Sequence, residues 1–184
     1  MRTLIPTIRS IRNFLSFNAL HTVKNLYNLI TDKMKSTAIR RATKKDGKQL
    51  LTLVNALADY EKLKRPTRAA CARLLRDTFG KRKRIDVFLA FAGKQAVGYA
   101  IFFETYSSFL ALPTLYLEDI FVLKEFRKQK IGYKLFQRVL AETKHRRCGR
   151  MEWMVLDWNK LALDFYKKLG AQQMKSWLLH RIEH

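Results

Sequence analysis

Hydrophobic and polar positions follow two different periods along the chain, and the changes between them predict the order of its helices and strands. Over residues 44–63 apolar side chains recur every three or four positions, as on one face of a helix. Thr43 can cap the start of this helix. Pro66 favours a new helix start, so a second helix is expected over 67–79.

Shorter apolar stretches bounded by turn residues predict strands. We expect them at 37–42, 85–91, 96–106, 116–122, 150–158 and 174–182. Gly93 marks a hairpin turn, residues 107–114 form a loop, and helices follow the fourth strand and span 161–170. The order is strand, two helices, three strands, helix, strand, helix, strand. It predicts a mixed α/β sheet covered by helices.

Composition narrows the class of protein without identifying it. The 184 residues suit one domain, and 48% of them are hydrophobic, enough for a sizeable core. The net charge of +22 attracts nucleic acid, anionic lipid and phosphorylated ligands, or serves solubility alone. No known nucleic-acid-binding module is visible, so this attraction is expected to be non-specific. Cys71 and Cys148 indicate neither a disulfide framework nor a zinc site.

The first 35 residues differ from the rest of the chain. They hold six cations and one acid, Asp32, with apolar residues near helical spacing. No apolar run there is long enough to cross a bilayer. The segment is an organelle-targeting peptide, a surface helix, or an extension from a misassigned start upstream of Met34. We therefore expect a basic extension over 1–35, a domain over 36–184, and a cytoplasmic location unless the extension is a transit peptide.

A basic loop precedes the helix that follows the fourth strand. Arg127, Lys128 and Lys130 surround the start of this helix, and Gly132 allows close backbone approach. Unpartnered N–H groups and the helix dipole make such a start a site for an anion such as pyrophosphate. An ordinary basic loop with a glycine that eases the turn is the alternative.

Two sequence blocks carry a resemblance to a known family. They are YLEDIFVLKEFRKQKIGYKLF and MEWMVLDWNKLALDFYKKLGA. Together they resemble the GNAT superfamily of N-acetyltransferases, and most closely its spermidine/spermine (diamine) group, from about Thr37 to the C-terminus. The resemblance implies a mixed, mostly antiparallel central sheet with a splayed parallel pair and helices on both faces. It also implies acetyl-CoA as co-substrate, no metal, a small-molecule amine acceptor, direct attack in a ternary complex, and often a homodimer.

The same resemblance assigns a set of residues to coenzyme A. They are the strand backbone of Ile120, Phe121 and Val122, the loop and helix start Arg127, Lys128, Gln129, Lys130, Ile131, Gly132 and Tyr133, and Asn159 and Lys167. The loop departs from the family pattern, because Lys130 replaces its middle glycine and Lys128 a further one. If the middle position needs a positive φ, Lys130 is strained and coenzyme affinity suffers.

Acetyl transfer from a thioester to an amine needs a base for the ammonium proton and benefits from an acid at the leaving thiolate. Glu118 matches the glutamate of the family on a strand expected to bury two acids, and it is the base candidate. Tyr166 matches the family tyrosine and is the acid candidate. A strand carboxylate paired with nearby cations and an aromatic ring packed on the sheet are the respective alternatives.

The resemblance also points to residues that contact the acceptor: Tyr60, Glu61, Asp119 and Phe109. Ser107 stands where diamine-specific relatives carry an acid, so a polyamine, a lysine-like small molecule and a peptide amine all stay open. Two further functions stay open as well. One is a GNAT-fold binding protein with weak or no turnover, and the other is a ribosome- or nucleic-acid-associated protein acetyltransferase.

Overall fold

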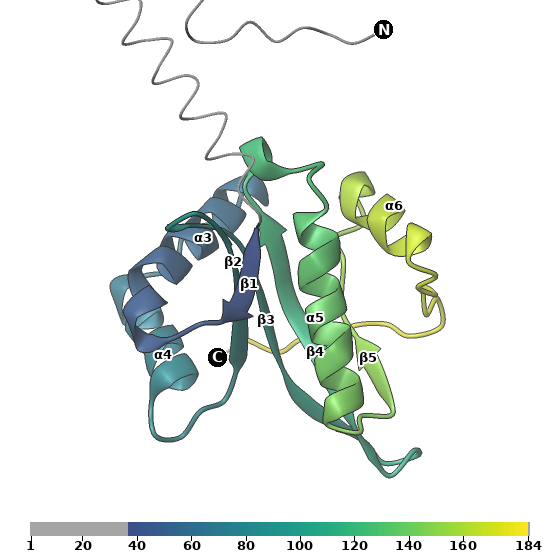
Figure 1. Cartoon of the computed structure of the whole chain (residues 1–184). Helices are drawn as coiled ribbons and strands as arrows, with labels where there is room; N and C mark the ends of the chain where they lie inside the picture. The colour runs from purple at the N-terminus through teal and green to yellow at the C-terminus, as the bar shows by residue number, and fades with distance from the viewer. Residues whose placement is uncertain (1–36, 184) are drawn as a thin grey trace, which may run out of the picture. The chain divides into compact units, whose positions relative to one another are not determined.

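The computed structural model describes residues 37–183, so the predictions for residues 1–35 lie outside the described part of the chain. The elements, shown in Figure 1, are β1 (Ala38–Arg41), η1 (Lys44–Asp46), α3 (Gly47–Tyr60), α4 (Arg68–Phe79), β2 (Asp86–Ala92), β3 (Gln95–Ser107), β4 (Leu112–Val122), η2 (Lys124–Phe126), α5 (Ile131–His145), β5 (Arg150–Glu152) and α6 (Lys160–Lys168). The predicted mixed α/β class is confirmed.

The sheet has five strands in the order β1-β2-β3-β4-β5. The first three pairings are antiparallel. The chain leaves β4, returns along α5, and re-enters the sheet where Gly149 N–H donates to the Pro113 carbonyl at 2.9 Å, beside the start of β4. β5 therefore runs parallel to β4. The expected mostly antiparallel sheet with one parallel pair is confirmed.

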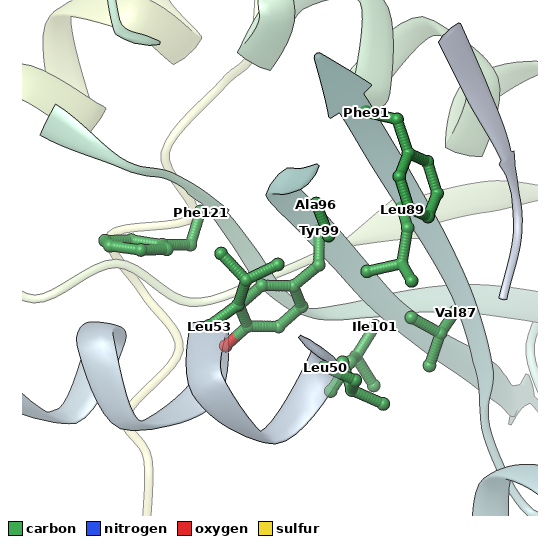
Figure 2. Close-up of a cluster of buried hydrophobic side chains, with 9 residues drawn as sticks. All are labelled: Leu50, Leu53, Val87, Leu89, Phe91, Ala96, Tyr99, Ile101 and Phe121. Carbon is green, nitrogen blue, oxygen red and sulfur yellow. The ribbon is translucent and has the colours of Figure 1, made fainter. Parts of the chain in front are cut away.

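Helices cover both faces of the sheet. On one face, Leu50 and Leu53 of α3 pack against alternate residues of β2, β3 and β4, among them Leu89, Tyr99 and Phe121 (Figure 2). On the other face α5 contributes its buried side chains, which are Ile131, Leu135, Phe136, Val139 and Thr143. Because both faces are covered, the middle of β2 is buried on every residue rather than on alternate ones.

The structure differs from the predicted strands and loops in three places. The loop expected over 107–114 is a tight hairpin, because Ser107 and Leu112 already pair across β3 and β4. The strand expected over 150–158 ends at Glu152. The strand expected over 174–182 is absent from the structure of these residues, although they are rich in apolar side chains. A strand needs a neighbouring backbone to pair with, and apolar composition does not supply one.

The chain separates into two compact units, one ending at Met151 and one from Glu152 to His184. The first holds the three antiparallel pairings and α3 to α5. The second holds α6, where the Tyr166 ring contacts those of Trp153 and Phe165, at centroid distances of 4.9 and 5.2 Å. The single domain over 36–184 stays a prediction.

A group of ion pairs ties α5 to the sheet in the first unit. Arg146 donates to Asp86 at 2.6 Å, to Glu142 at 2.8 Å and to Glu104 at 2.9 Å. Arg41 also pairs with Asp86 and Glu142. Burial pushes the pKa of Asp86 and Glu142 upward, but the hydrogen bonds from the cations outweigh it, and both pKa values lie below their ordinary range. This group stabilises the fold at neutral pH.

Candidate functional site

β4 contains a β-bulge at Glu118. Asp119 lies opposite Ile101 of β3 and Leu117 lies opposite Phe102, so Glu118 is the extra residue between the two pairs. Glu118 is exposed and Asp119 is half-buried. The expectation that both acids are buried is wrong for Glu118, because the extra residue leaves its side chain in solvent.

Asp119 accepts a hydrogen bond from Tyr99, which was not among the predicted site residues. Tyr99 of β3 is 0% exposed, and its hydroxyl donates to Asp119 Oδ2 at 3.2 Å. A buried phenol in an otherwise apolar strand needs a polar partner, and this was the available signal in the sequence. The bond places the Asp119 carboxylate on the face of the sheet that α3 covers.

The ionisation of this carboxylate is strongly altered. Burial and the nearby charge of Glu118 raise the pKa of Asp119 to about 6, against the opposing hydrogen bond from Tyr99. Burial also raises the pKa of Glu61, at the end of α3, and its charge acts on Asp119 as well. None of these three acids has a salt bridge within residues 37–183. The structure thus gathers Glu61, Glu118 and Asp119 into an acidic cluster to which no cation of residues 37–183 makes a salt bridge.

Tyr60 and Phe121, two further predicted site residues, lie beside this cluster, and both contact Arg127. The Arg127 guanidinium stands 4.6 Å from the ring centroid of Tyr60 and 5.6 Å from that of Phe121. Its Nε donates to the Val122 carbonyl at 2.9 Å. Arg127 is therefore fixed at the end of β4 by ring and backbone contacts and leaves the acids unpaired.

The start of α5 has unpartnered backbone donors. Its N-cap is Lys130, which makes no side-chain capping bond. The first N–H to find an acceptor within the helix is that of Lys134, at 2.9 Å from the Lys130 carbonyl. The N–H groups of Ile131, Gly132 and Tyr133 precede it and have no acceptor of this kind. With the helix dipole, they form a site suited to an anion.

Both lysines that replace family glycines have positive φ. The value is 62° at Lys128 and 60° at Lys130. In this region the Cβ of an L-residue crowds the backbone, which costs roughly 1–2 kcal/mol per residue. Lys130 also puts a cation at the positive end of the helix dipole. The loop therefore keeps a glycine-type backbone with lysine side chains and stores strain.

Lys130→Gly is expected to raise the free energy of unfolding by about 0.5–1 kcal/mol, because relief of strain exceeds the extra entropy of glycine in the unfolded chain. Urea denaturation measures this. Lys134→Gly, inside α5, is the matched control and should lower stability by about 1 kcal/mol. A Lys130→Gly protein no more stable than the unaltered one would contradict the strain.

Gly132 is not required by the fold. Its φ is not positive, and a Cβ built on it would meet only Val122, at an ordinary 3.9 Å. By contrast, a Cβ at Gly98 would come within 2.8 Å of the Phe121 carbonyl. The protein alone would accept alanine at Gly132, so any need for glycine there must come from a ligand.

Among residues 37–183, no strand pairs with the second edge of β4 near its end. Ile120, Phe121 and Val122 pair with Ala100, Tyr99 and Gly98 of β3. β5 has three residues and begins beside Pro113, so it cannot reach that far along β4. Arg127 already occupies the Val122 carbonyl, and a further extended chain could bind the other backbone groups on this edge, as an added strand would.

The remaining predicted residues divide between the second unit and a hairpin tip. Asn159 caps α6 by accepting from Ala162 N–H at 3.2 Å. Lys167 is exposed and Tyr166 is buried. Phe109 is 97% exposed at the tip of the β3–β4 hairpin. From Leu112 to Glu118 the strand covers ~20 Å, so the structure does not bring Phe109 to the acidic cluster of its own chain.

The described residues offer neither a membrane span nor a metal site. Within residues 37–183 no helix is long and apolar enough to cross a membrane. In the same range no group of three or more His, Cys, Asp or Glu side chains could hold a metal ion.

The mixed sheet, the bulged β4 and the uncapped, cationic start of α5 define an α/β protein whose α5 start is suited to an anion. Residues 49–171 match the Acetyltransferase (GNAT) family. The chain belongs to this family, and it is an acyltransferase.

Curated relatives agree with this assignment, and a solved structure agrees with the fold. The chain is 33% identical to the thialysine N-epsilon-acetyltransferase of Mus musculus over 82% of its length and 94% of the relative. It is 30% identical to the human spermidine/spermine N(1)-acetyltransferase-like protein 1, over 78% of this chain and 22% of that one. The structure of AAC(6')-Iy with the bisubstrate analogue CoA-S-monomethyl-acetylneamine has a TM-score of 0.68 at 20% identity, over 82% of this chain and 100% of that chain. The resemblance to the diamine acetyltransferase group is confirmed.

Proposed function

We propose that the protein transfers the acetyl group of acetyl-CoA to a primary amine of a small molecule that carries a second cationic group. The acidic cluster of Glu61, Glu118 and Asp119 is the observation that carries this proposal. The chain has 37 lysines and arginines and 15 acids, yet these three acids have no salt bridge among the described residues. Carboxylates without a salt-bridge partner, of which Glu118 and Glu61 raise the pKa of Asp119, suit a cationic ligand. Relatives named for thialysine and for spermidine and spermine support this acceptor class.

The start of α5 fits the pyrophosphate of coenzyme A. The N–H groups of Ile131, Gly132 and Tyr133 would donate to it, and Lys128, Gln129 and Lys130 would surround it. The anion would also compensate for the strained lysines and for the cation at the helix start. The free edge of β4 at Ile120–Val122 would pair with the pantetheine arm. Asn159 and Lys167 are proposed coenzyme contacts on the resemblance alone.

Gly132→Ala is expected to weaken acetyl-CoA binding about tenfold or more without destabilising the protein. The new methyl group would stand between the backbone donors and the phosphate, whereas the fold has room for it. Calorimetric titration with acetyl-CoA, beside a thermal melt, measures both effects. Ala162→Gly, also near a helix start, is not a coenzyme contact and serves as the control. Unchanged affinity in Gly132→Ala would argue against phosphate binding here.

The carboxylates would act on the amine. An ammonium has no free electron pair, so a base must take its proton before nitrogen attacks the thioester carbonyl. Asp119, with a pKa of about 6, is mostly ionised at pH 7 and accepts protons more readily than an ordinary aspartate. Exposed Glu118, the base candidate from the sequence, lies next to it on the bulge. We propose that the two acids share proton removal, while Glu61 and Tyr60 bind the distal part of the acceptor.

Tyr166→Phe is expected to lower kcat about 100-fold with little change in acetyl-CoA affinity, because only the proton donor for the leaving thiolate is lost. Its ring contacts with Trp153 and Phe165 survive in phenylalanine. Thiol release under saturating acetyl-CoA measures kcat. Phe165→Leu, which alters the same packing without touching the hydroxyl, is the control. An unaltered kcat in Tyr166→Phe would remove this tyrosine as the acid.

An amine panel tests the proposed function. Thiol release from acetyl-CoA is measured with putrescine, spermidine, thialysine, lysine and, as a control with a single charge, butylamine. Acceptors with a second cation should give higher kcat/KM than butylamine, and Glu61→Gln should reduce this preference. If acetyl-CoA binds but no amine stimulates release, the protein is a binding protein of this fold. If butylamine equals the dications, the acidic cluster does not select the acceptor.

A further inference from the structure

We propose that the outward face of α4 and the loops on either side of it bind the phosphodiester backbone of nucleic acid. This surface, called the basic face below, comprises Lys62, Lys64, Arg65, Arg68, Arg73, Arg76, Lys81, Arg82, Lys83 and Arg84. All ten side chains are exposed. The inference goes beyond acetyl transfer, because α4 contributes none of the proposed coenzyme or acceptor contacts.

Positive charge is concentrated on the basic face beyond the already high average of the chain. Residues 62–84 hold ten of the 37 cations and one of the 15 acids, Asp77. A surface of one sign attracts polyanions from a distance and raises their local concentration. This segment is therefore the strongest continuous source of positive potential that the described sequence offers.

Most of these cations are free of ion pairs. Arg65 pairs with Asp59, Arg76 contacts Asp77 at 3.4 Å, and Lys83 pairs with Asp86. The other seven have no salt bridge within residues 37–183. Free cations keep their counterions until a polyanion releases them, and this release drives binding to nucleic acid.

The arrangement on α4 suits a phosphate backbone. At 100° per residue, Arg68, Ala72, Arg76, Ala69 and Arg73 follow one another within about 140° of the helix surface, and all five are exposed. Arg68 and Arg76 stand ~12 Å apart along the axis, which spans more than one phosphate of a single strand. The small alanines between the arginines let a backbone approach the helix closely.

The composition of the basic face favours nucleic acid over a membrane surface. Six of its ten cations are arginines, whose planar guanidinium matches phosphate oxygens in pairs. Within residues 62–84 the one large apolar side chain that is strongly exposed is Leu63, whereas membrane-surface helices present a broad apolar face. Within residues 62–84 no strongly exposed aromatic ring is available for bases to stack on. Binding should therefore not depend on the nucleotide sequence.

The test compares two triple variants of the full-length protein. Arg68→Gln/Arg73→Gln/Arg82→Gln removes three unpaired cations of the basic face. Lys94→Gln/Lys144→Gln/Arg147→Gln removes the same charge from exposed positions elsewhere that also lack a salt bridge among the described residues. Fluorescence anisotropy is measured with labelled single-stranded RNA and duplex DNA of about 20 nucleotides or base pairs, at several salt concentrations, with and without saturating acetyl-CoA.

The basic-face variant is expected to bind both probes at least about tenfold more weakly and to lower the salt slope by about two for RNA and about three for duplex DNA. The control variant should change much less, acetyl-CoA should not compete, and acetyl transfer should stay unchanged in both. Equal weakening in the two variants would assign the effect to net charge and overturn the proposal. Competition by acetyl-CoA would assign it to the start of α5. Tighter binding to vesicles of 30% phosphatidylserine than to either probe would assign the face to membranes.

Discussion

Replacing Asp119 by asparagine is expected to lower kcat/KM for the amine at least about 100-fold while making the protein more stable at neutral pH. Proton transfer by a positioned side chain contributes typically 10²–10⁴-fold. The amide cannot take the proton, but it can still accept the bond that Tyr99 donates. The packing around the site should therefore survive, and the loss should appear in the rate.

The rise in stability follows from the direction of the pKa change. The pKa of Asp119 is about 6 in the folded protein and 3.8 in its ordinary environment. Its ionised form therefore destabilises the fold above pH 6, and this penalty disappears as the pH falls toward 4. The difference corresponds to at most about 3 kcal/mol, and the solvent contact of a half-buried group reduces it to about 2 kcal/mol. The Asp119→Asn protein should be more stable than the unaltered protein by this amount at pH 8, and almost equally stable at pH 4.

Glu118→Gln is the matched comparison, since it removes the neighbouring charge from an exposed position on the same strand. It should lower the pKa of Asp119, because the charge of Glu118 is one of its causes. The acid limb of the pH–rate profile should then move below pH 6. Asp119→Asn should abolish that limb. If the acid limb of the pH–rate profile stays near pH 6 in Asp119→Asn, another group is the base. A gain of stability in this variant would not by itself support Asp119 as the base.

Arg146→Met is expected to lower the free energy of unfolding by about 3 kcal/mol at pH 7. Methionine fills much of the volume but leaves Asp86, Glu142 and Glu104 without their shared partner. Removing one member of a buried ion pair typically costs 3–5 kcal/mol, and the 19% exposure of the arginine side chain favours the lower end. Guanidinium chloride and urea denaturation measure the change.

The pH dependence of this loss separates it from a packing defect. The pKa values of Asp86 and Glu142 are lowered in the folded protein, so their stabilising contribution is present above their ordinary pKa near 4 and is lost as the pH falls further. The difference in free energy of unfolding between Arg146→Met and the unaltered protein should therefore become smaller below about pH 4. Lys144→Met, on the same helix and exposed without a salt bridge in the described chain, should change stability little. A gap independent of pH would indicate lost packing instead.

Part of the site could be predicted from residues close together in the sequence. The start of α5 combines a strand, a basic loop and a glycine within residues 116–132, and its backbone donors are a property of any helix start. Asn159 acts on Ala162, three residues away. Strain at Lys130 was predicted if its position needs a positive φ, and its φ of 60° meets that condition. The positive φ of Lys128 was not predicted.

Other parts depended on neighbours that no local pattern contains. Tyr99 binds Asp119 because the register of β3 and β4 brings them together from opposite strands. The bulge that exposes Glu118 changes the alternation by one residue, and nothing in YLEDIFV marks it. The segment 174–182 has the composition of a strand but no partner strand in the described chain.

By itself, therefore, the sequence determined the helices with a clear apolar face, the strand order along the chain, the excess of positive charge and the cationic start of α5. These depend on interactions within a few residues, where periodicity and side-chain chemistry act directly. Only the tertiary structure decided which acid is withdrawn from water, which phenol binds it, and that Glu61 acts on the same carboxylate. A pKa is set by burial and by charges brought near through space, and these exist only once distant strands and helices have packed.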